Sequence, residues 1–247
     1  MVGYAIVYAY GQIVLKVRVT GRNKLVPGPQ ILASNHVSNF DPLLVGLGAR
    51  REIHFLAKEE LFAASRWFAW LIHTYNAWPV RRGGGDPAAI KRCSWLLGKR
   101  QTVVLFPEGT RSKTGDINQF KPGIGMLAIT NHVPVVPVHL GGMSHSIISY
   151  LVDKDFVKRG FRKKPQRNEG IHISFADPVY PEGFSADRQG YEGIAQEVER
   201  RVRVLAGEQP KSEVRRQKSE CTSRNGSSPQ PSPQGGEGER SEGEEGI

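Results

Sequence analysis

Cysteine is scarce in this sequence of 247 residues, which contains only Cys93 and Cys221. Two cysteines provide neither a disulfide framework nor a metal site, so we expect a protein of a reducing compartment. The sequence also lacks an internal repeat and any recognised nucleic-acid-binding motif. These absences exclude disulfide scaffolds and repeat proteins, and they leave an ordinary globular domain.

A long apolar run is missing at the N-terminus. Residues 2–15 carry no charge, which is shorter than the ~20 apolar residues of a membrane-spanning helix. No basic segment precedes them and no clear cleavage site follows, so a secretory signal is not expected. The tyrosines of this stretch and the basic residues after it indicate that residues 1–20 form a segment at the membrane interface. A buried first helix or strand is the alternative.

The C-terminal residues 208–247 contain almost no apolar side chains and are rich in Ser, Pro, Gly, Glu and Gln. Such a composition cannot bury enough apolar surface to fold, so we expect this tail to be disordered. The remaining length suits one domain, over residues 21–207.

Acidic residues are outnumbered in the body of the chain. The formal net charge is +10, and the tail holds six Lys/Arg and eight Asp/Glu, so residues 1–207 carry +12. This excess indicates an anionic partner: a phosphate-bearing substrate, an acidic lipid surface or nucleic acid. The loop 154–167 alone has seven Lys/Arg with Phe156 and Phe161 between them, which suits an anionic membrane and equally single-stranded nucleic acid.

The most informative stretch runs from Ser34 to Pro42, after the apolar residues 31–33 and before the apolar residues 43–45. We expect His36 to leave a buried strand and Asp41 to open a helix. On one continuous helix these side chains would point about 140° apart, so they meet only if the chain bends at Ser38–Asn39. In that case His36 can accept a proton from a hydroxyl while Asp41 orients its ring.

Asp41 also has a plain structural interpretation. Asp-Pro before an apolar run is typical of a helix N-cap followed by proline at the first helical position. The chain repeats this pattern at Asp86-Pro87, where no chemistry is apparent.

A second candidate site follows residues 102–106, the clearest strand in the sequence, which is rich in β-branched residues. The loop after it places Glu108, Gly109, Thr110 and Arg111 at the carboxyl end of a buried strand. Backbone N–H groups, a hydroxyl and a guanidinium form a good phosphate site, and ligands of open α/β sheets bind at that end. The alternative is a polar turn in which Glu108 and Arg111 pair only with each other.

The remaining pattern alternates short strands with helices, which predicts an α/β domain. Pro137 interrupts the apolar run 135–140 and indicates an edge strand or a local irregularity. Residues 61–72 form an apolar helix with aromatics on more than one face, so part of it is expected to meet lipid or an acyl chain. We expect strands at 31–33, 54–57, 77–80, 102–106, 135–140 and 171–175, and further helices at 41–48, 86–97, 120–132 and a final one through Ile194 to Leu205.

Four of these stretches resemble the sequence blocks of the 1-acylglycerol-3-phosphate acyltransferase family of glycerolipid acyltransferases. The segment 35–41 resembles its His-four-residues-Asp block, and 76–82 resembles its second block, which ends here in Arg82. The segments 106–111 and 135–138 resemble the third and fourth blocks. The resemblance spans about residues 15–205, and the first and third blocks together carry most of its specificity. Asn76 stands where the family usually has glycine, and the N-terminal apolar part is shorter than in members with spanning helices.

The resemblance implies a single α/β domain with a central, mostly parallel sheet flanked by helices, and an acyl transfer reaction. His36 would deprotonate the hydroxyl of a lysolipid, which attacks the thioester of acyl-CoA or acyl-carrier protein, while Asp41 orients His36. Arg82, Glu108, Gly109, Thr110 and Arg111 would hold the polar head of the acceptor, with Lys58 as a weaker candidate.

The resemblance also implies a setting for the reaction. No metal or bound cofactor is needed, since the thioester is already activated. The expected acceptor is 1-acyl-sn-glycerol 3-phosphate, and another lysophospholipid or an amino-acid lysolipid is the alternative. The expected place is the cytoplasmic face of the cell membrane, held peripherally or monotopically. A non-enzymatic nucleic-acid-binding protein is the rival from another class, and no nucleic-acid partner is expected.

Overall fold

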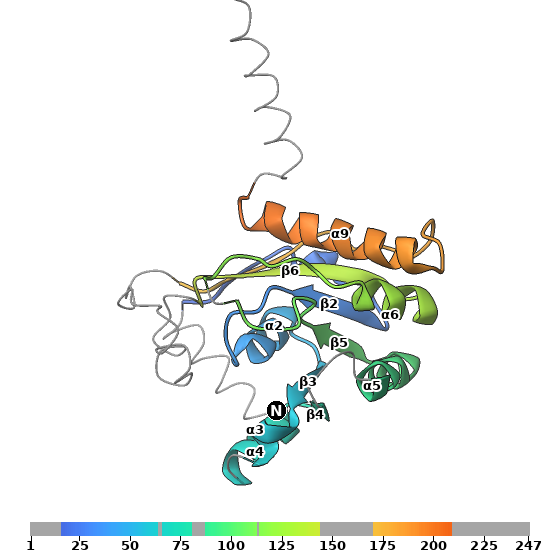
Figure 1. Cartoon of the computed structure of the whole chain (residues 1–247). Coiled ribbons are helices and arrows are strands. Elements are labelled where there is room, and N and C mark those ends of the chain that lie inside the picture. Colours follow the sequence, from blue (N-terminus) through green and yellow to red (C-terminus); the bar gives the residue numbers. More distant parts are fainter. Residues whose placement is uncertain (1–15, 64–65, 81–86, 113, 144–169, 209–247) are drawn as a thin grey trace, which may run out of the picture. The chain divides into compact units, whose positions relative to one another are not determined.

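The computed structural model describes residues 16–63, 66–80, 87–112, 114–143 and 170–208 (Figure 1). Several predictions therefore concern residues outside the described part: the interface segment up to residue 15, Arg82, the basic loop 154–167 and the disorder of the tail.

A seven-stranded sheet forms the centre of the domain, in the order β1-β7-β6-β2-β5-β3-β4. Neighbouring strands are parallel except β6 and β7, which are antiparallel, so β6, β2, β5, β3 and β4 all run in one direction. The predicted mostly parallel α/β sheet is thus confirmed. Its strands are β1 (Arg18–Thr20), β2 (Gln30–Ser34), β3 (His54–Lys58), β4 (Ala77–Val80), β5 (Thr102–Leu105), β6 (Val135–Gly141) and β7 (His172–Phe175).

The central strands are short and apolar because both of their faces are covered. All five residues of β2 are buried. Leu32 packs into one cluster with Val104 of β5, while Ile31 and Val103 pack into another cluster on the opposite face. The alternation of neighbouring side chains along each strand therefore divides the core into two layers.

Helices cover both faces of the sheet. Helix α2 (Asp41–Ala49) lies on one face, where its Leu44, Val45 and Leu47 join the cluster around Leu32. Helices α5 (Pro87–Gly98), α6 (Gly123–Asn131) and α9 (Arg188–Leu205) supply the cluster on the other face, and α9 runs along β6 in Figure 1. The short helix η1 (Arg22–Lys24) follows β1.

The described residues of the aromatic stretch that follows β3 are helical, in α3 (Glu59–Ala63) and α4 (Arg66–Thr74). The Trp70 side chain on α4 is 60% exposed, whereas Ile72 is buried in the core. Among the residues that the structure describes, no helix is both long and apolar enough to cross a membrane.

Of two local predictions, the one for Pro137 holds in its second alternative, a local irregularity, and the other needs correction. Strand β6 lies between β7 and β2, so Pro137 is not on an edge. Ala176 donates to the Pro137 carbonyl and Val135 pairs with Val179, so the facing chain carries one extra residue beside the proline, as in a bulge. The correction concerns β1, which pairs with β7 and therefore makes residues 18–20 part of the sheet rather than of an interface segment.

The direction of the strands decides where the candidate residues lie. Because β2, β5, β3 and β4 are mutually parallel, their carboxyl ends meet at one edge of the sheet. His36 follows β2, Glu108 follows β5, and Lys58 is the last residue of β3. This edge is therefore the candidate active site.

Candidate active site

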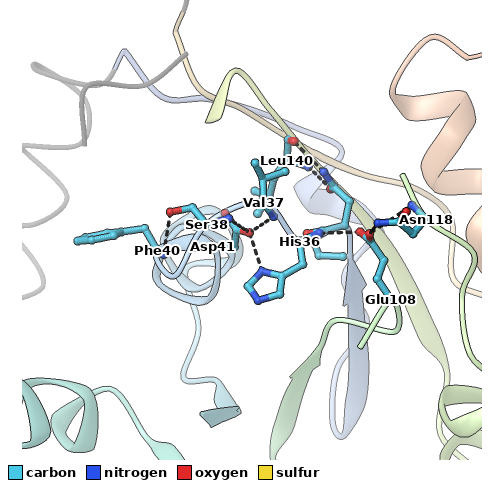
Figure 2. Close-up of polar contacts among 10 residues, drawn as sticks. His36, Val37, Ser38, Phe40, Asp41, Glu108, Asn118 and Leu140 are labelled. Carbon is cyan, nitrogen blue, oxygen red and sulfur yellow. Dashed lines mark hydrogen bonds and ion pairs between the residues drawn. The ribbon is translucent and has the colours of Figure 1, made fainter. Parts of the chain in front are cut away.

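A tight turn brings His36 and Asp41 together. The Asp41 N–H donates to the Ser38 carbonyl at 3.2 Å, and the Phe40 N–H donates to the Ser38 hydroxyl at 3.3 Å. The turn aims the Asp41 side chain back at the strand, and its Oδ2 lies 2.8 Å from the His36 Nδ1 (Figure 2). The bend expected at Ser38–Asn39 is the one that forms.

The Asp41 carboxylate serves the turn rather than the helix. Oδ2 accepts from the His36 ring and from the N–H groups of Val37 and Ser38, at 2.6 and 2.8 Å for the backbone donors. Oδ1 is buried and has no hydrogen-bond partner among the described residues. The N-cap of α2 is Phe40, and no side chain caps that helix end. The capping interpretation of Asp41 is therefore wrong, since the carboxylate faces residues 36–38.

The contact with Asp41 determines which nitrogen of His36 is available. An ionised carboxylate only accepts hydrogen bonds, so Nδ1 carries the proton and Nε2 has the free lone pair. The imidazole stacks on the Phe106 ring, with 4.1 Å between centroids and 25° between planes. The side chain is only 9% exposed. A histidine held in this way can act as a general base through Nε2.

The backbone of His36 is fixed by the loop after β5. Its N–H donates to Glu108 Oε1 at 2.8 Å, and its carbonyl accepts from the Ser112 N–H at 2.7 Å. The other oxygen of Glu108 accepts from the Asn118 backbone and side chain, at 3.2 and 2.6 Å. Burial raises the pKa of the Glu108 carboxyl, and the hydrogen bonds from His36 and Asn118 act in the opposite direction. Both oxygens of this buried carboxylate thus contact protein donors.

A second set of hydrogen bonds fixes the end of β2 from the side of β6. The Asn35 side chain donates to the Leu140 carbonyl at 3.0 Å and accepts from the Leu140 N–H at 2.8 Å. These two bonds tie the end of β2 to β6 at the residue before His36 (Figure 2). The histidine is therefore held between β5 and β6 before any substrate binds.

Three of the predicted anion-binding residues, Gly109–Arg111, follow the buried Glu108 after β5, at the same end of the sheet. Gly109 and Thr110 are exposed and Arg111 is partly exposed. The φ angle of Gly109 is +74°, a left-handed conformation that glycine adopts without strain. Lys58 is partly buried at the end of β3. The structure brings His36, Asp41 and Glu108 into direct or shared contact, whereas Arg82 lies outside the described residues.

Four further residues shape the site and were not predicted from the sequence. Asn35 and Phe106 adjoin the predicted residues, so their position in the same motifs was the only available signal. The contacts of Ser112 and Asn118 depend on how the loop folds back.

Asn76, the departure from the family pattern, adopts φ +57°. Asparagine tolerates this left-handed conformation better than most residues, which explains how it replaces the usual glycine.

Comparison with known proteins connects this geometry to a family. The acyltransferase family model matches residues 16–141, just over half of the chain and the part that contains His36, Asp41 and the loop 106–112. The chain belongs to the acyltransferase family. Its members transfer an acyl group from a donor to an acceptor, as the family name states.

Individual relatives narrow the comparison. The chain is 34% identical over 134 residues to a chloroplastic 1-acyl-sn-glycerol-3-phosphate acyltransferase of Arabidopsis thaliana, over 51% of this acyltransferase and 36% of the relative. It is 28% identical to the lyso-ornithine lipid O-acyltransferase of Pseudomonas aeruginosa, over 68% of this chain and 66% of the relative. The match thus spans about a third of the length of the Arabidopsis relative.

A solved structure supports the fold over a greater length. The 1-acyl-sn-glycerophosphate acyltransferase PlsC of Thermotoga maritima superposes with a TM-score of 0.62 and 26% identity. The alignment covers 84% of this acyltransferase and 81% of that chain. The sheet and its flanking helices are therefore an architecture that a lysophosphatidic acid acyltransferase also has.

Proposed function

We propose that this acyltransferase moves a fatty acyl chain from a thioester to the free hydroxyl of 1-acyl-sn-glycerol 3-phosphate, giving phosphatidic acid. The observation that carries the proposal is the buried His36–Asp41 pair, whose Nδ1–Oδ2 contact of 2.8 Å leaves Nε2 as a proton acceptor at the carboxyl edge of the sheet. The names of the Arabidopsis and Thermotoga relatives supply the substrate class.

The reaction requires one base and no change of oxidation state. His36 Nε2 takes the proton of the acceptor hydroxyl as its oxygen attacks the thioester carbonyl. The tetrahedral intermediate then collapses, the C–S bond breaks, and the proton on His36 passes to the leaving thiolate. Asp41 stabilises the imidazolium formed between these two transfers.

Glu108 has a different role in this proposal from the one that its motif suggests. Its two oxygens contact His36 and Asn118, and a carboxylate is a poor partner for a phosphate because both are negative. We assign Glu108 to positioning His36. The acceptor phosphate then contacts the exposed loop Gly109–Arg111 together with Arg82, with Lys58 as a further candidate.

The thioester donor is acyl-CoA or acyl-carrier protein in this proposal. Neither a metal nor a bound cofactor is required, because thiolate is already a good leaving group. We also propose that the protein binds the cytoplasmic face of a membrane without crossing it, since both lysolipid and product reside in a bilayer. The exposed Trp70 on α4 suits a membrane interface.

A lyso-ornithine lipid is the second candidate acceptor. It is favoured by the Pseudomonas relative, which matches two thirds of both chains. One assay separates the candidates: purified protein is incubated with a panel of lysolipids, with acyl-CoA and acyl-carrier protein tested in parallel. We expect the highest kcat/KM with 1-acyl-sn-glycerol 3-phosphate. A preference for the ornithine lipid would reject the acceptor and keep the chemistry, and no transfer to any lysolipid would reject both.

The proposed anion contacts have their own test. Replacing Arg82 or Arg111 by Lys keeps the charge but removes the guanidinium, which can form two parallel hydrogen bonds to a phosphate. We expect a higher KM for the phosphate-bearing acceptor and a smaller change for the donor. Equal changes for both substrates would assign these arginines to the fold or to the chemistry instead.

A further inference from the structure

Lys121, two residues before the start of α6, lies against the loop that follows β5. Its backbone N–H donates to the Pro107 carbonyl at 3.0 Å, which fixes the residue beside that loop. Its side chain then runs back over Gly109: a Cβ added to Gly109 would lie 2.6 Å from the Lys121 Nζ and 3.1 Å from its Cε. Since a Cα–C bond is about 1.5 Å long, the ammonium lies within about 4 Å of the Gly109 Cα.

Within the described part of the chain, no acidic group accounts for this position of the ammonium. Among the described residues, no carboxylate forms an ion pair with Lys121, and the side chain is exposed. Glu108, the acidic residue of the loop, is buried and contacts His36 and Asn118 instead. A positive charge is thus held against the loop, while the carboxylate of Glu108 accepts hydrogen bonds from His36 and Asn118.

This arrangement requires glycine at position 109 for two reasons, the backbone conformation and the space beside it. Its φ of +74° favours glycine, and the absent side chain leaves the space that the lysine end-group occupies. Thr110, which is exposed, and Arg111, which is partly exposed, follow directly. Residues 109–111 thus carry backbone N–H groups, a hydroxyl and a guanidinium in one short stretch of loop, with the Lys121 ammonium beside Gly109, and all of these groups suit an anion.

We propose that Lys121 is an additional binding residue for the phosphate of the acceptor, acting as a point charge beside the Gly109–Arg111 loop. The inference rests on the proposed function and deepens it, because it makes Lys121 a determinant of preference for phosphate-bearing over zwitterionic acceptors. The competing role is structural, in which Lys121 only covers the glycine and holds the loop in place.

The test compares Lys121→Met, which keeps the length of the side chain without its charge, with Lys121→Arg. We expect Lys121→Met to raise the KM for 1-acyl-sn-glycerol 3-phosphate about tenfold or more, since a hydrogen bond to a charged group contributes ~1.5–3 kcal/mol. The donor KM should stay within about twofold, and Lys121→Arg should restore most of the acceptor affinity. Lys99→Met is the matched control, because Lys99 is an exposed lysine after α5, near the opposite edge of the sheet.

A second readout does not depend on turnover. Glycerol 3-phosphate should raise the Tm of the wild type and of Lys99→Met, and should do so less for Lys121→Met. A lower Tm of Lys121→Met without ligand, with unchanged acceptor KM and an unchanged shift, would establish the structural role and overturn the proposal. If the wild type does not acylate the phosphate-bearing acceptor at all, the proposed function fails, and the ligand-induced shift still decides whether Lys121 binds a phosphate.

Discussion

Two buried histidines lie at opposite ends of the parallel strands, one at the carboxyl ends and one at the amino ends. His36 follows the carboxyl end of β2, and His54 is the first residue of β3. Their exposed fractions are nearly equal, 7% and 8%. His54 Nδ1 accepts from the Trp78 indole N–H at 3.2 Å, and its Nε2 lies 3.3 Å from Gln101 Oε1. Both nitrogens of His54 are therefore engaged.

The difference lies in the partners and not in the burial. A Trp N–H only donates, so His54 carries its proton on Nε2, whereas the carboxylate of Asp41 places the proton of His36 on Nδ1. His36 thus keeps one lone pair for a substrate, and His54 has none. Burial alone therefore does not distinguish a candidate base, whereas a partner that leaves the other nitrogen free does.

The largest effect is expected for His36→Ala. A general base typically contributes about 10²–10⁴-fold to a rate, so kcat should fall by that factor when the proposed base is removed. Glu108 and Ser112 contact the backbone of His36, so the loop should keep its structure and the Tm should change little. Turnover within a few-fold of the wild type, in a folded variant, would remove His36 from the mechanism.

A smaller loss of activity is expected for Asp41→Asn. The amide oxygen can still accept the donors that now contact Oδ2, but the negative charge beside the imidazolium is lost. A charge-assisted bond contributes ~1.5–3 kcal/mol, so kcat should fall about 10- to 150-fold. The variant should remain folded at the assay temperature, which thermal unfolding checks. A kcat equal to that of the wild type would reduce Asp41 to a support of the turn.

The stacked ring of Phe106 should matter less. Phe106→Leu removes the aromatic contact with the imidazole, and such a contact is worth ~0.5–1.5 kcal/mol beyond its buried area. We expect kcat to fall by about two- to tenfold, and Phe106→Tyr, which keeps the ring, to lose less. If both variants lose activity equally, the ring contact is not what orients His36.

The smallest effect on turnover is expected for His54→Leu. Loss of the imidazole leaves the Trp78 N–H and the Gln101 side chain without their partner, at a cost of ~1–3 kcal/mol. The Tm should therefore fall by about 2–10 °C, while kcat per folded molecule stays within about twofold of the wild type. A large loss of kcat with an unchanged Tm would break the contrast between the two histidines.

Much of this arrangement could be predicted because it depends on local patterns. The runs at Ile31, Val103 and Val135 are apolar on both faces, which is the signature of buried parallel strands, and their parallel pairing places the motifs at one edge. The turn between His36 and Asp41 followed from Ser38 and Asn39. Strand β1 was missed, because its three residues alternate in burial without an apolar run.

The contacts of Glu108 and Lys121 could not be predicted for a different reason. An acidic residue in a polar loop is usually exposed, so nothing in the sequence signals that Glu108 turns inward to a backbone N–H that is 72 residues away. The same holds for Lys121, whose approach to Gly109 depends on how the loop returns to Pro107. His54 lies in no recognised motif, and its contacts with Trp78 and Gln101 are evident only from the structure.

The hydrogen bonds around His36 also determine the order in which the candidate active site can assemble. The His36–Asp41 contact joins residues only five apart, and it can form as soon as the turn does. The bonds from Glu108 and Leu140 join residues 72 and 105 apart, so they must wait until β5 and β6 have docked on β2. Recovered acyl transfer should therefore be one of the last signals to return on refolding, after the helical signal, which makes turnover a reporter of completed long-range assembly.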